Sequence, residues 1–97
     1  MTGPGETING AKVICWSAID DRHTITGKCH QTIDGKTKSP YAGIAIGQRP
    51  NDAMAYLFFC DGQWRPVTDT YHLNVDRAKD EAEIEFNGVH KTWNVLG

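Results

Sequence analysis

The stretch "MAYLFFCDGQWRPV", residues 54–67, decides most of the fold. Its first seven residues are apolar, which is typical of a central strand with both faces covered. The Asp61-Gly62 pair that follows is a strong signal for a two-residue hairpin turn. We therefore expect two antiparallel strands in which the ring of Phe59 lies opposite the ring of Trp64.

Three further strands are expected upstream, because residues 11–19, 24–33 and 41–48 are rich in β-branched, aromatic or alternating side chains. Residues 34–40 have the composition of a turn. The small residues of the 41–48 strand predict that a helix packs closely against it. Downstream, Pro66 cannot donate a hydrogen bond to a neighbouring strand, so its strand is expected at a sheet edge or at a bulge.

One helix is expected over about residues 75–87, where apolar side chains recur on one face. Asn74 is suited to cap its first turn, and Gly88 is a typical residue after a last turn. Residues 93–96 then form a short terminal strand or a tail that packs on the sheet. The apolar stripe of the helix consists of Val75, Ala78, Ala82, Phe86 and Val89.

The expected fold class is α+β: an antiparallel sheet of about five strands, covered on one face by the single helix of residues 75–87. A length of 97 residues suffices for one domain. Residues 1–10 hold three glycines and one proline, so we expect them to be a flexible leader. The single domain then comprises residues 11–97.

The formal net charge is −2 and the pI is about 6.0, which argues against a nucleic-acid binder. Residues 1–50 hold six Lys and Arg against four Asp and Glu, whereas residues 51–97 hold four against eight. The acidic C-terminal half would suit a basic protein partner. No apolar run approaches the ~20 residues that span a membrane, and no basic-then-apolar leader opens the chain. We expect a cytoplasmic protein with reduced thiols.

Three cysteines and four histidines raise the question of catalysis or metal binding. A straight hairpin would hold Cys60 and His72 more than about 20 Å apart, too far for a nucleophile and its base. Cys29 and His30 are strand neighbours and point to opposite faces. The chain has no Cys-x-x-Cys pair and no His pair at ligand spacing. We therefore expect no catalytic residue, no metal site and no cofactor. The helix carboxylates are expected on a solvated face: Asp76, Asp80, Glu81, Glu83 and Glu85.

Residues 68–72 are largely polar and lie between the hairpin and the helix. Asp and Thr side chains readily bond nearby backbone N–H groups, so one interpretation is that this segment shapes the entrance to the helix. The alternative is a small ligand pocket. Its lining would consist of Trp64, Asp69, Tyr71 and His72.

Ile84 is expected on the polar side of the helix, opposite the apolar stripe. A single exposed isoleucine is ordinary. In so small a domain it is also a candidate anchor for a second copy or another protein, with Arg77 and Asp80 beside it. Incidental exposure and a contact with the C-terminal tail are the alternatives.

Residues 56–93 contain "YLFFCDGQW", "VTDTYH" and "DRAKDEAEIEFNGVHKTW" in that order. This succession resembles small, uncharacterised bacterial proteins of the kind encoded in mobile integron gene cassettes. In these proteins an aromatic strand, a Cys-Asp turn, a Thr-Asp-Thr segment and a helix follow one another. The group has no known activity, so the resemblance implies no function.

These observations favour a small non-catalytic interaction or accessory domain that acts as a homodimer. One alternative is an immunity-type protein that neutralises a basic toxin through its acidic C-terminal half. Another is a small-molecule binder that uses the region of Trp64, Tyr71 and His72. An enzyme is not expected, and neither nucleic acid nor a membrane is an expected partner.

Overall fold

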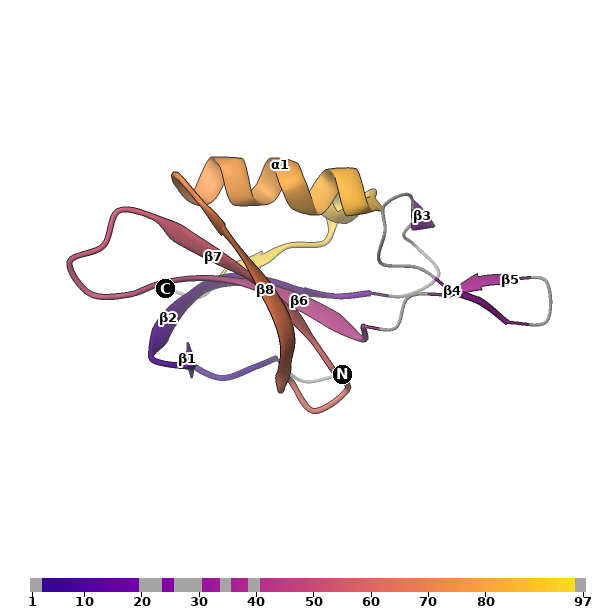
Figure 1. The fold of residues 1–97 in the computed structure, drawn as a ribbon, viewed down its shortest axis with the longest axis horizontal. Coiled ribbons are helices and arrows are strands. Elements are labelled where there is room, and N and C mark those ends of the chain that lie inside the picture. Colours follow the sequence, from indigo (N-terminus) through magenta and orange to yellow (C-terminus); the bar gives the residue numbers. More distant parts are fainter. Residues whose placement is uncertain (1–2, 20–23, 26–30, 34–35, 39–40, 96–97) are drawn as a thin grey trace.

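A computed structural model describes residues 3–19, 24–25, 31–33, 36–38 and 41–95. Within these residues, six strands form one antiparallel sheet, and a single α-helix, α1 (Val75–Glu85), lies across one face of it (Figure 1). The α+β class that the sequence predicts is therefore confirmed.

The main sheet has a simple order of strands. Its members are β1 (Thr7–Ile8), β2 (Ala11–Ala18), β6 (Gly43–Gln48), β7 (Ala55–Cys60), β8 (Pro66–His72) and β10 (Asn94–Val95). β2, β6, β7 and β8 are consecutive antiparallel neighbours. The short strands β1 and β10 both pair with the other side of β2. The terminal strand expected near residues 93–96 is thus present as β10.

Two short strand pairs lie outside the main sheet. β3 (Thr24–Ile25) pairs with β9 (Phe86–Asn87), and β4 (Gln31–Ile33) pairs with β5 (Lys36–Lys38). The strand expected over 24–33 is described only at residues 24–25 and 31–33, and these two parts pair with two different strands. Lys36–Lys38 was expected in a turn and forms a strand instead.

α1 forms where the apolar stripe predicts it. Asn74 caps the first turn, since its Oδ1 accepts the N–H of Arg77 at 2.9 Å. Ala78 and Ala82 are fully buried, so the helix lies close to the sheet. The helix ends at Glu85, slightly before the predicted end at 87, because the next two residues form β9. A short 3₁₀ helix, η1 (Val89–Lys91), follows.

One hydrophobic core lies between α1 and the sheet. The rings of Phe59 and Phe86 meet there with centroids 6.2 Å apart. Every residue of the apolar stripe contributes to this core, with Val75 at its border. The predicted stripe is therefore confirmed. Burial of this much apolar surface is the main stabilising term of the fold. The fully packed members are Cys15, Ile44, Ile46, Ala55, Leu57, Phe59, Ala78, Ala82, Phe86 and Val89.

A second core covers the opposite face of the sheet, as the apolar run of β7 implies, although the sequence did not indicate its members. Its members are Ile8, Ala11, Val13, Ala45, Phe58, Cys60 and Trp64. A Cβ on Gly43 would lie only 2.5 Å from the ring of Trp64. The glycines and Ala45 of β6 therefore make room for aromatic rings on this face. This corrects the expectation that the small residues of the strand admit the helix.

β2 contributes side chains to both cores because of a β-bulge. Val13 lies opposite Gly47, and Cys15 lies opposite Ile46, so Ile14 is an extra residue in the strand. Val13 consequently packs in the second core and Cys15 in the core beneath α1. Simple alternation along the sequence would have placed both on one face.

The connection between β7 and β8 is longer than the two-residue turn that Asp61-Gly62 predicts. Cys60 lies opposite Pro66, and Phe59 lies opposite Thr68. The expected pairing of Phe59 with Trp64 is therefore wrong. The Asp61 Oδ1 atom accepts the backbone N–H groups of Gln63 and Arg65, which holds the loop closed. These hydrogen bonds, that of Arg65 first, lower the pKa of the Asp61 carboxyl.

Trp64 adopts a left-handed backbone conformation with φ +63° in this loop. Such a φ is uncommon for a bulky residue and carries strain. The ring is buried against Gly43 and meets the ring of Trp16 edge to face, with centroids 5.4 Å apart. Burial of the indole offsets the strain, so Trp64 serves the second core. Pro66 opens a strand at the sheet edge with a bulge beside it, as expected.

Residues 7–10 belong to the folded domain. Asn9 and Gly10 have φ values of +49° and +81° and join β1 to β2 in a two-residue turn. The Ile8 side chain is only 5% exposed and packs in the second core. The domain boundary expected at residue 11 therefore lies too late, since at least residues 7 and 8 are part of the sheet.

Candidate functional site

The two edges of the main sheet differ. Within the described residues, β1 and β10 cover one edge by pairing with β2, whereas no strand pairs with the outer side of β8. β8 crosses the front of the molecule in Figure 1. An edge strand presents backbone N–H and C=O groups that can pair with another strand. We call Pro66–His72 and the adjoining Leu73 the β8 edge.

The side chains of β8 alternate between the two faces of the sheet. Thr70 lies opposite Leu57 of the core beneath α1, and His72 lies opposite Ala55 of the same core. Asp69 lies opposite Phe58 of the second core. Thr68, Thr70 and His72 are therefore on the α1 face, while Asp69 and Tyr71 are on the other face. The bulge at Val67 interrupts this alternation between Pro66 and Thr68.

Polar contacts hold three of these side chains in place. The Thr70 Oγ1 and His72 Nε2 atoms are 2.6 Å apart. On the other face, the Tyr71 hydroxyl donates to the Asp52 carboxylate at 2.9 Å. This hydrogen bond is the largest cause that raises the pKa of Tyr71 to about 12. The pKa of Asp52 is lowered, first by the N–H of Met54 and then by the Tyr71 hydroxyl.

The Tyr71 ring is also fixed by its neighbours. Its centroid lies 4.5 Å from that of Tyr56, and the Arg49 guanidinium lies 5.1 Å above the Tyr56 ring. Tyr71 thus has a defined orientation although it is 47% exposed. A side chain that is ordered before binding loses less conformational entropy when a partner covers it.

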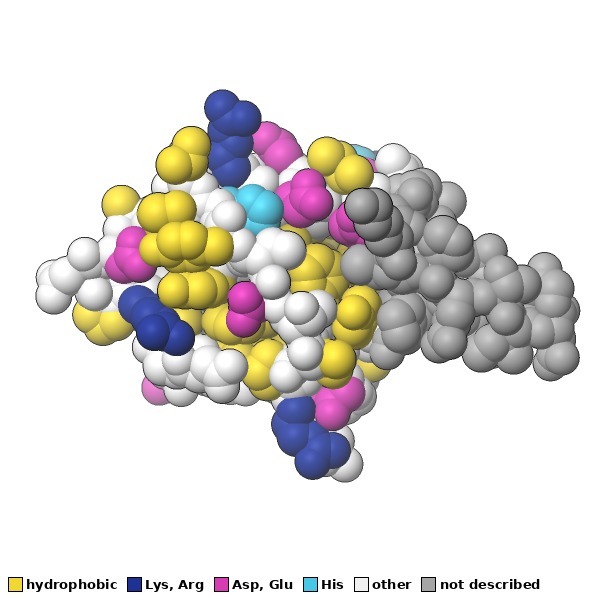
Figure 2. Space-filling model, viewed as in Figure 1, with side chains coloured by type: hydrophobic (Ala, Val, Ile, Leu, Met, Phe, Trp, Pro, Cys, Tyr) yellow, Lys and Arg dark blue, Asp and Glu magenta, His cyan; other side chains and the backbone are white. Residues whose placement is uncertain are grey.

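The β8 edge carries most of the exposed large hydrophobic side chains of the described residues. Val67 is 61% exposed, Tyr71 47% and Leu73 68%, and the two others are Ile84 and Val95. Figure 2 shows hydrophobic side chains gathered where β8 passes into α1. Exposed apolar side chains that are grouped in this way are typical of interaction sites.

The four residues of the expected ligand pocket do not come together. Trp64 is buried in the second core, near the Cys60 end of β7. Tyr71 lies opposite Tyr56, which is four residues from Cys60 along β7. Tyr71 is therefore about 13 Å from the Cys60 end of the strand, where Trp64 lies. His72 is on the α1 face, whereas Asp69 and Tyr71 are on the other. These positions do not support a pocket lined by all four side chains.

The structure also separates Cys60 from His72. Cys60 belongs to the second core, and His72 lies on the α1 face at the other end of β7. Burial raises the pKa of the Cys60 thiol to about 12, and the nearby Asp61 carboxylate adds to the effect. Burial likewise raises the pKa of the Cys15 thiol to about 11. Neither thiol supplies appreciable thiolate at neutral pH.

The residues of the other expected interface lie on the outer side of α1. Ile84 is 61% exposed, and Arg77 and Asp80 are exposed as well. This face therefore presents one large apolar side chain, compared with three at the β8 edge.

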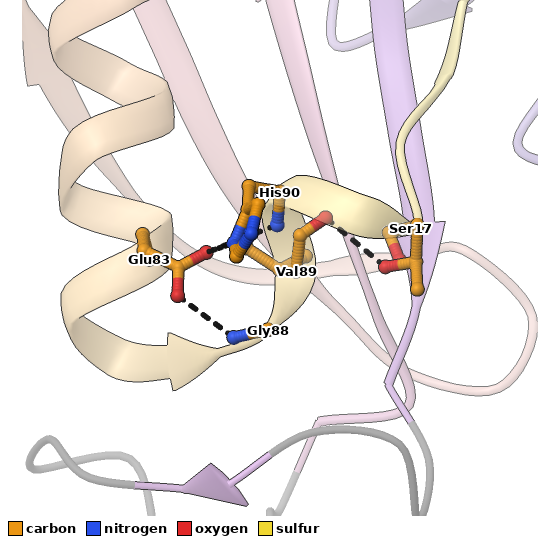
Figure 3. Close-up of polar contacts among 6 residues, drawn as sticks. Ser17, Glu83, Gly88, Val89 and His90 are labelled. Atoms are coloured by element: carbon orange, nitrogen blue, oxygen red, sulfur yellow. Dashed lines mark hydrogen bonds and ion pairs between the residues drawn. The ribbon is translucent and has the colours of Figure 1, made fainter.

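Glu83 has a role that the sequence did not reveal. It was expected on a solvated face, yet its carboxylate accepts the N–H of Gly88 at 2.7 Å and that of His90 at 3.0 Å (Figure 3). His90 Nδ1 lies 2.7 Å from the same carboxylate. Partial burial opposes ionisation of Glu83, but these hydrogen bonds outweigh it and lower the pKa. Glu83 thereby fixes the turn that leads from α1 through η1 toward β10.

Among the described residues, no three His, Cys, Asp or Glu side chains gather closely enough to hold a metal ion. Cys29 and His30 lie outside those residues. In the same part of the chain, no helix is long and apolar enough to cross a bilayer.

No family model matches the chain, and neither the curated proteins nor the solved structures contain a match to it. The resemblance to integron cassette proteins therefore stays a prediction.

Proposed function

We propose that the protein is a non-catalytic interaction domain that acts as a homodimer, with the β8 edge as its contact surface. The observation that carries the proposal is that β8 has three exposed hydrophobic side chains along an edge with which no strand of the described residues pairs. Each feature alone is common, but together they provide both the backbone hydrogen bonds and the apolar area of an interface.

The chemistry of the described side chains supports a binding role over a catalytic one. The two thiols in this part of the chain are buried and held protonated by their surroundings. His72 is at the other end of β7 from Cys60 and on the opposite face of β8 from Tyr71, so a nucleophile, a base and an orienting group do not meet there. We propose a cytoplasmic location because Cys15 and Cys60 are both unpaired thiols, which a reducing compartment preserves.

The proposal is tested by the mass of the protein in solution over a range of concentrations. Light scattering coupled to size exclusion, or sedimentation velocity, should give twice the monomer mass of 10.8 kDa at high concentration and a decrease on dilution. A monomer mass at every concentration would contradict the homodimer. An interface restricted to seven or eight residues is at the small end of specific interfaces, so a dilution-dependent equilibrium is expected.

A further inference from the structure

We infer that Asn9 is a site of spontaneous deamidation, and that Glu83 protects Asn87 from the same reaction. The sequence contains two Asn-Gly pairs, Asn9-Gly10 and Asn87-Gly88. Asparagine before glycine is especially prone to deamidation, because glycine has no side chain that hinders attack by its backbone nitrogen. The reaction takes place within the single chain, so it is independent of the proposed homodimer.

The reaction needs only water besides the chain itself. The backbone nitrogen of the glycine attacks the side-chain Cγ atom of the asparagine and loses its proton as the new C–N bond forms. The C–N bond of the side-chain amide breaks, and its nitrogen takes up a proton and leaves as ammonia. Water then opens the resulting five-membered succinimide at one of its two carbonyl groups. The product is aspartate or isoaspartate, and either one adds a negative charge at neutral pH.

The rate at each pair depends on how firmly its backbone is held. The peptide group between asparagine and glycine must rotate until the glycine nitrogen reaches the Cγ atom. A turn that is closed by hydrogen bonds has to open before this rotation. The free energy of local opening therefore decides which of the two asparagines reacts first.

The turn at Asn9 is weakly held. Asn9 and Gly10 are both exposed and form the tip of the hairpin between β1 and β2. Within the described part of the chain, no hydrogen bond from the Gly10 N–H group is found. Arg49 Nη2 donates to the Asn9 carbonyl at 3.2 Å, but this contact is exposed to water. Because β1 has only two residues, few backbone hydrogen bonds break when the turn opens.

The pair at Asn87 is held on both sides. Asn87 pairs with Thr24 between β9 and β3. The N–H group of Gly88, which contains the attacking nitrogen, donates to Glu83 Oε2 at 2.7 Å (Figure 3). The Gly88 carbonyl accepts the N–H of Lys91 at 3.1 Å. A hydrogen bond to a carboxylate is about twice as strong as one between neutral groups, so the attacking nitrogen is firmly retained.

Glu83 fixes the far side of the same turn as well. Its Oε1 atom accepts the N–H of His90 at 3.0 Å and lies 2.7 Å from His90 Nδ1. Rotation of the peptide before Gly88 would break the hydrogen bond to Oε2 and pull against those to Oε1. The carboxylate therefore opposes the movement that deamidation requires.

Deamidation at Asn9 would affect the hairpin that closes the β2 edge. Isoaspartate adds a methylene group to the main chain, so the two-residue turn no longer has its original length. Ile8, which is 5% exposed in the second core, directly precedes this turn. Chains with isoaspartate at position 9 should therefore hold β1 less firmly than unmodified chains.

Incubation at mildly alkaline pH, followed by peptide mapping with mass spectrometry, measures the rate at each asparagine. In the wild type, Asn9 should react at least about tenfold faster than Asn87. Glu83→Gln should raise the rate at Asn87 about fivefold and leave that at Asn9 unchanged. Glu81→Gln, which removes a carboxylate from the same helix, is the matched control and should change neither rate.

Equal rates at the two sites of the wild type, or a faster reaction at Asn87, would overturn the inference. An unchanged rate at Asn87 in Glu83→Gln would overturn protection by the carboxylate. A slower rate there would also overturn it, and would show that Glu83 acts as a base toward the Gly88 N–H group. Equal increases at Asn9 and Asn87 would indicate opening of the whole domain, which likewise contradicts local protection.

Discussion

The two edges of the sheet differ in what covers them. The β2 edge is closed by β1 and β10, which come from opposite ends of the chain, and Ile8 of β1 is buried in the second core. The β8 edge carries no partner strand among the described residues, and its apolar side chains at 67, 71 and 73 are exposed. One edge is thus built into the domain, and the other is the proposed contact surface.

This difference indicates that different residues of a small domain can determine the stability of the single chain and its association. Side chains at the closed edge are already desolvated in the single chain, so their loss should lower the free energy of unfolding. In the proposed dimer, side chains at the β8 edge are exposed in the single chain and become buried only on association. Their loss should weaken dimerisation and leave the single chain almost as stable as before.

The largest effect is expected at the closed edge. Ile8→Ala removes buried methyl groups from the second core and should lower the free energy of unfolding by about 2–3 kcal/mol. Urea denaturation measures this change, and Ile8→Val is the matched control with a loss below about 1.5 kcal/mol. An unchanged free energy of unfolding for Ile8→Ala would show that β1 does not close this edge.

The next effect concerns the β8 edge. Val67→Lys places a charge in the proposed contact surface and should weaken the dimer at least about tenfold, or about 1.4 kcal/mol. The free energy of unfolding of the single chain should change by less than about 0.5 kcal/mol. Sedimentation at several concentrations measures the dimer constant.

Val95→Lys is the matched control for that experiment, because Val95 is 70% exposed but lies on β10 at the closed edge. It should leave the dimer constant unchanged. Equal weakening by both substitutions would remove the distinction between the two edges.

A smaller effect is expected where the chain turns toward the closed edge. Glu83→Gln removes the charge that accepts hydrogen bonds from Gly88 and His90, and should lower the free energy of unfolding by about 1 kcal/mol at neutral pH. The hydrogen bonds lower the pKa of Glu83 in the folded state below its ordinary 4.5. Their contribution is therefore complete above that pH and is lost as the pH falls through the folded-state pKa.

Chemical denaturation of both proteins between pH 7 and pH 3 checks the sign. The difference in stability between the wild type and Glu83→Gln should shrink as the solution becomes acidic. A difference that is constant over this range would show that the carboxylate charge does not stabilise the turn.

The smallest effect is expected on the outer side of α1. Ile84→Lys changes an exposed apolar side chain away from β8 and should leave the dimer constant unchanged within error. The alternative interface at Ile84, Arg77 and Asp80 requires the opposite result. If Ile84→Lys shifted the protein to the monomer mass, the interface would lie on α1 and not at the β8 edge.

Two dipeptides that favour turns show which parts of the fold could be predicted from the sequence and which could not. Asn9-Gly10 forms a true two-residue hairpin, but it stands among glycines and a proline that suggested a leader. Asp61-Gly62 gave the stronger expectation, yet the Asp61 carboxylate stabilises a longer loop. A dipeptide indicates only a local preference for a turn. At Asp61-Gly62, the burial of Trp64 determines which of the allowed turns forms.

The helix was predictable because its signals are local. The cap at Asn74 and the apolar stripe both act within a few turns of one another. The apolar run of β7 predicted that both faces of the sheet are covered, but the members of the second core were not predictable. Small residues in β6 are compatible with either face, and the bulge at Ile14 changes the face of β2 without a sequence signal. The expected pocket was proposed from residues that are near in sequence, and the strand alternation of β8 separates them.

Amide hydrogen exchange measured at high and low protein concentration tests the central claim most directly. If β8 pairs with β8 of a second copy, amides between residues 67 and 73 exchange more slowly at the higher concentration, while those of β1 and β10 keep their rates. Exchange in β8 that is independent of concentration, across the range where the mass changes from monomer to dimer, would contradict the claim.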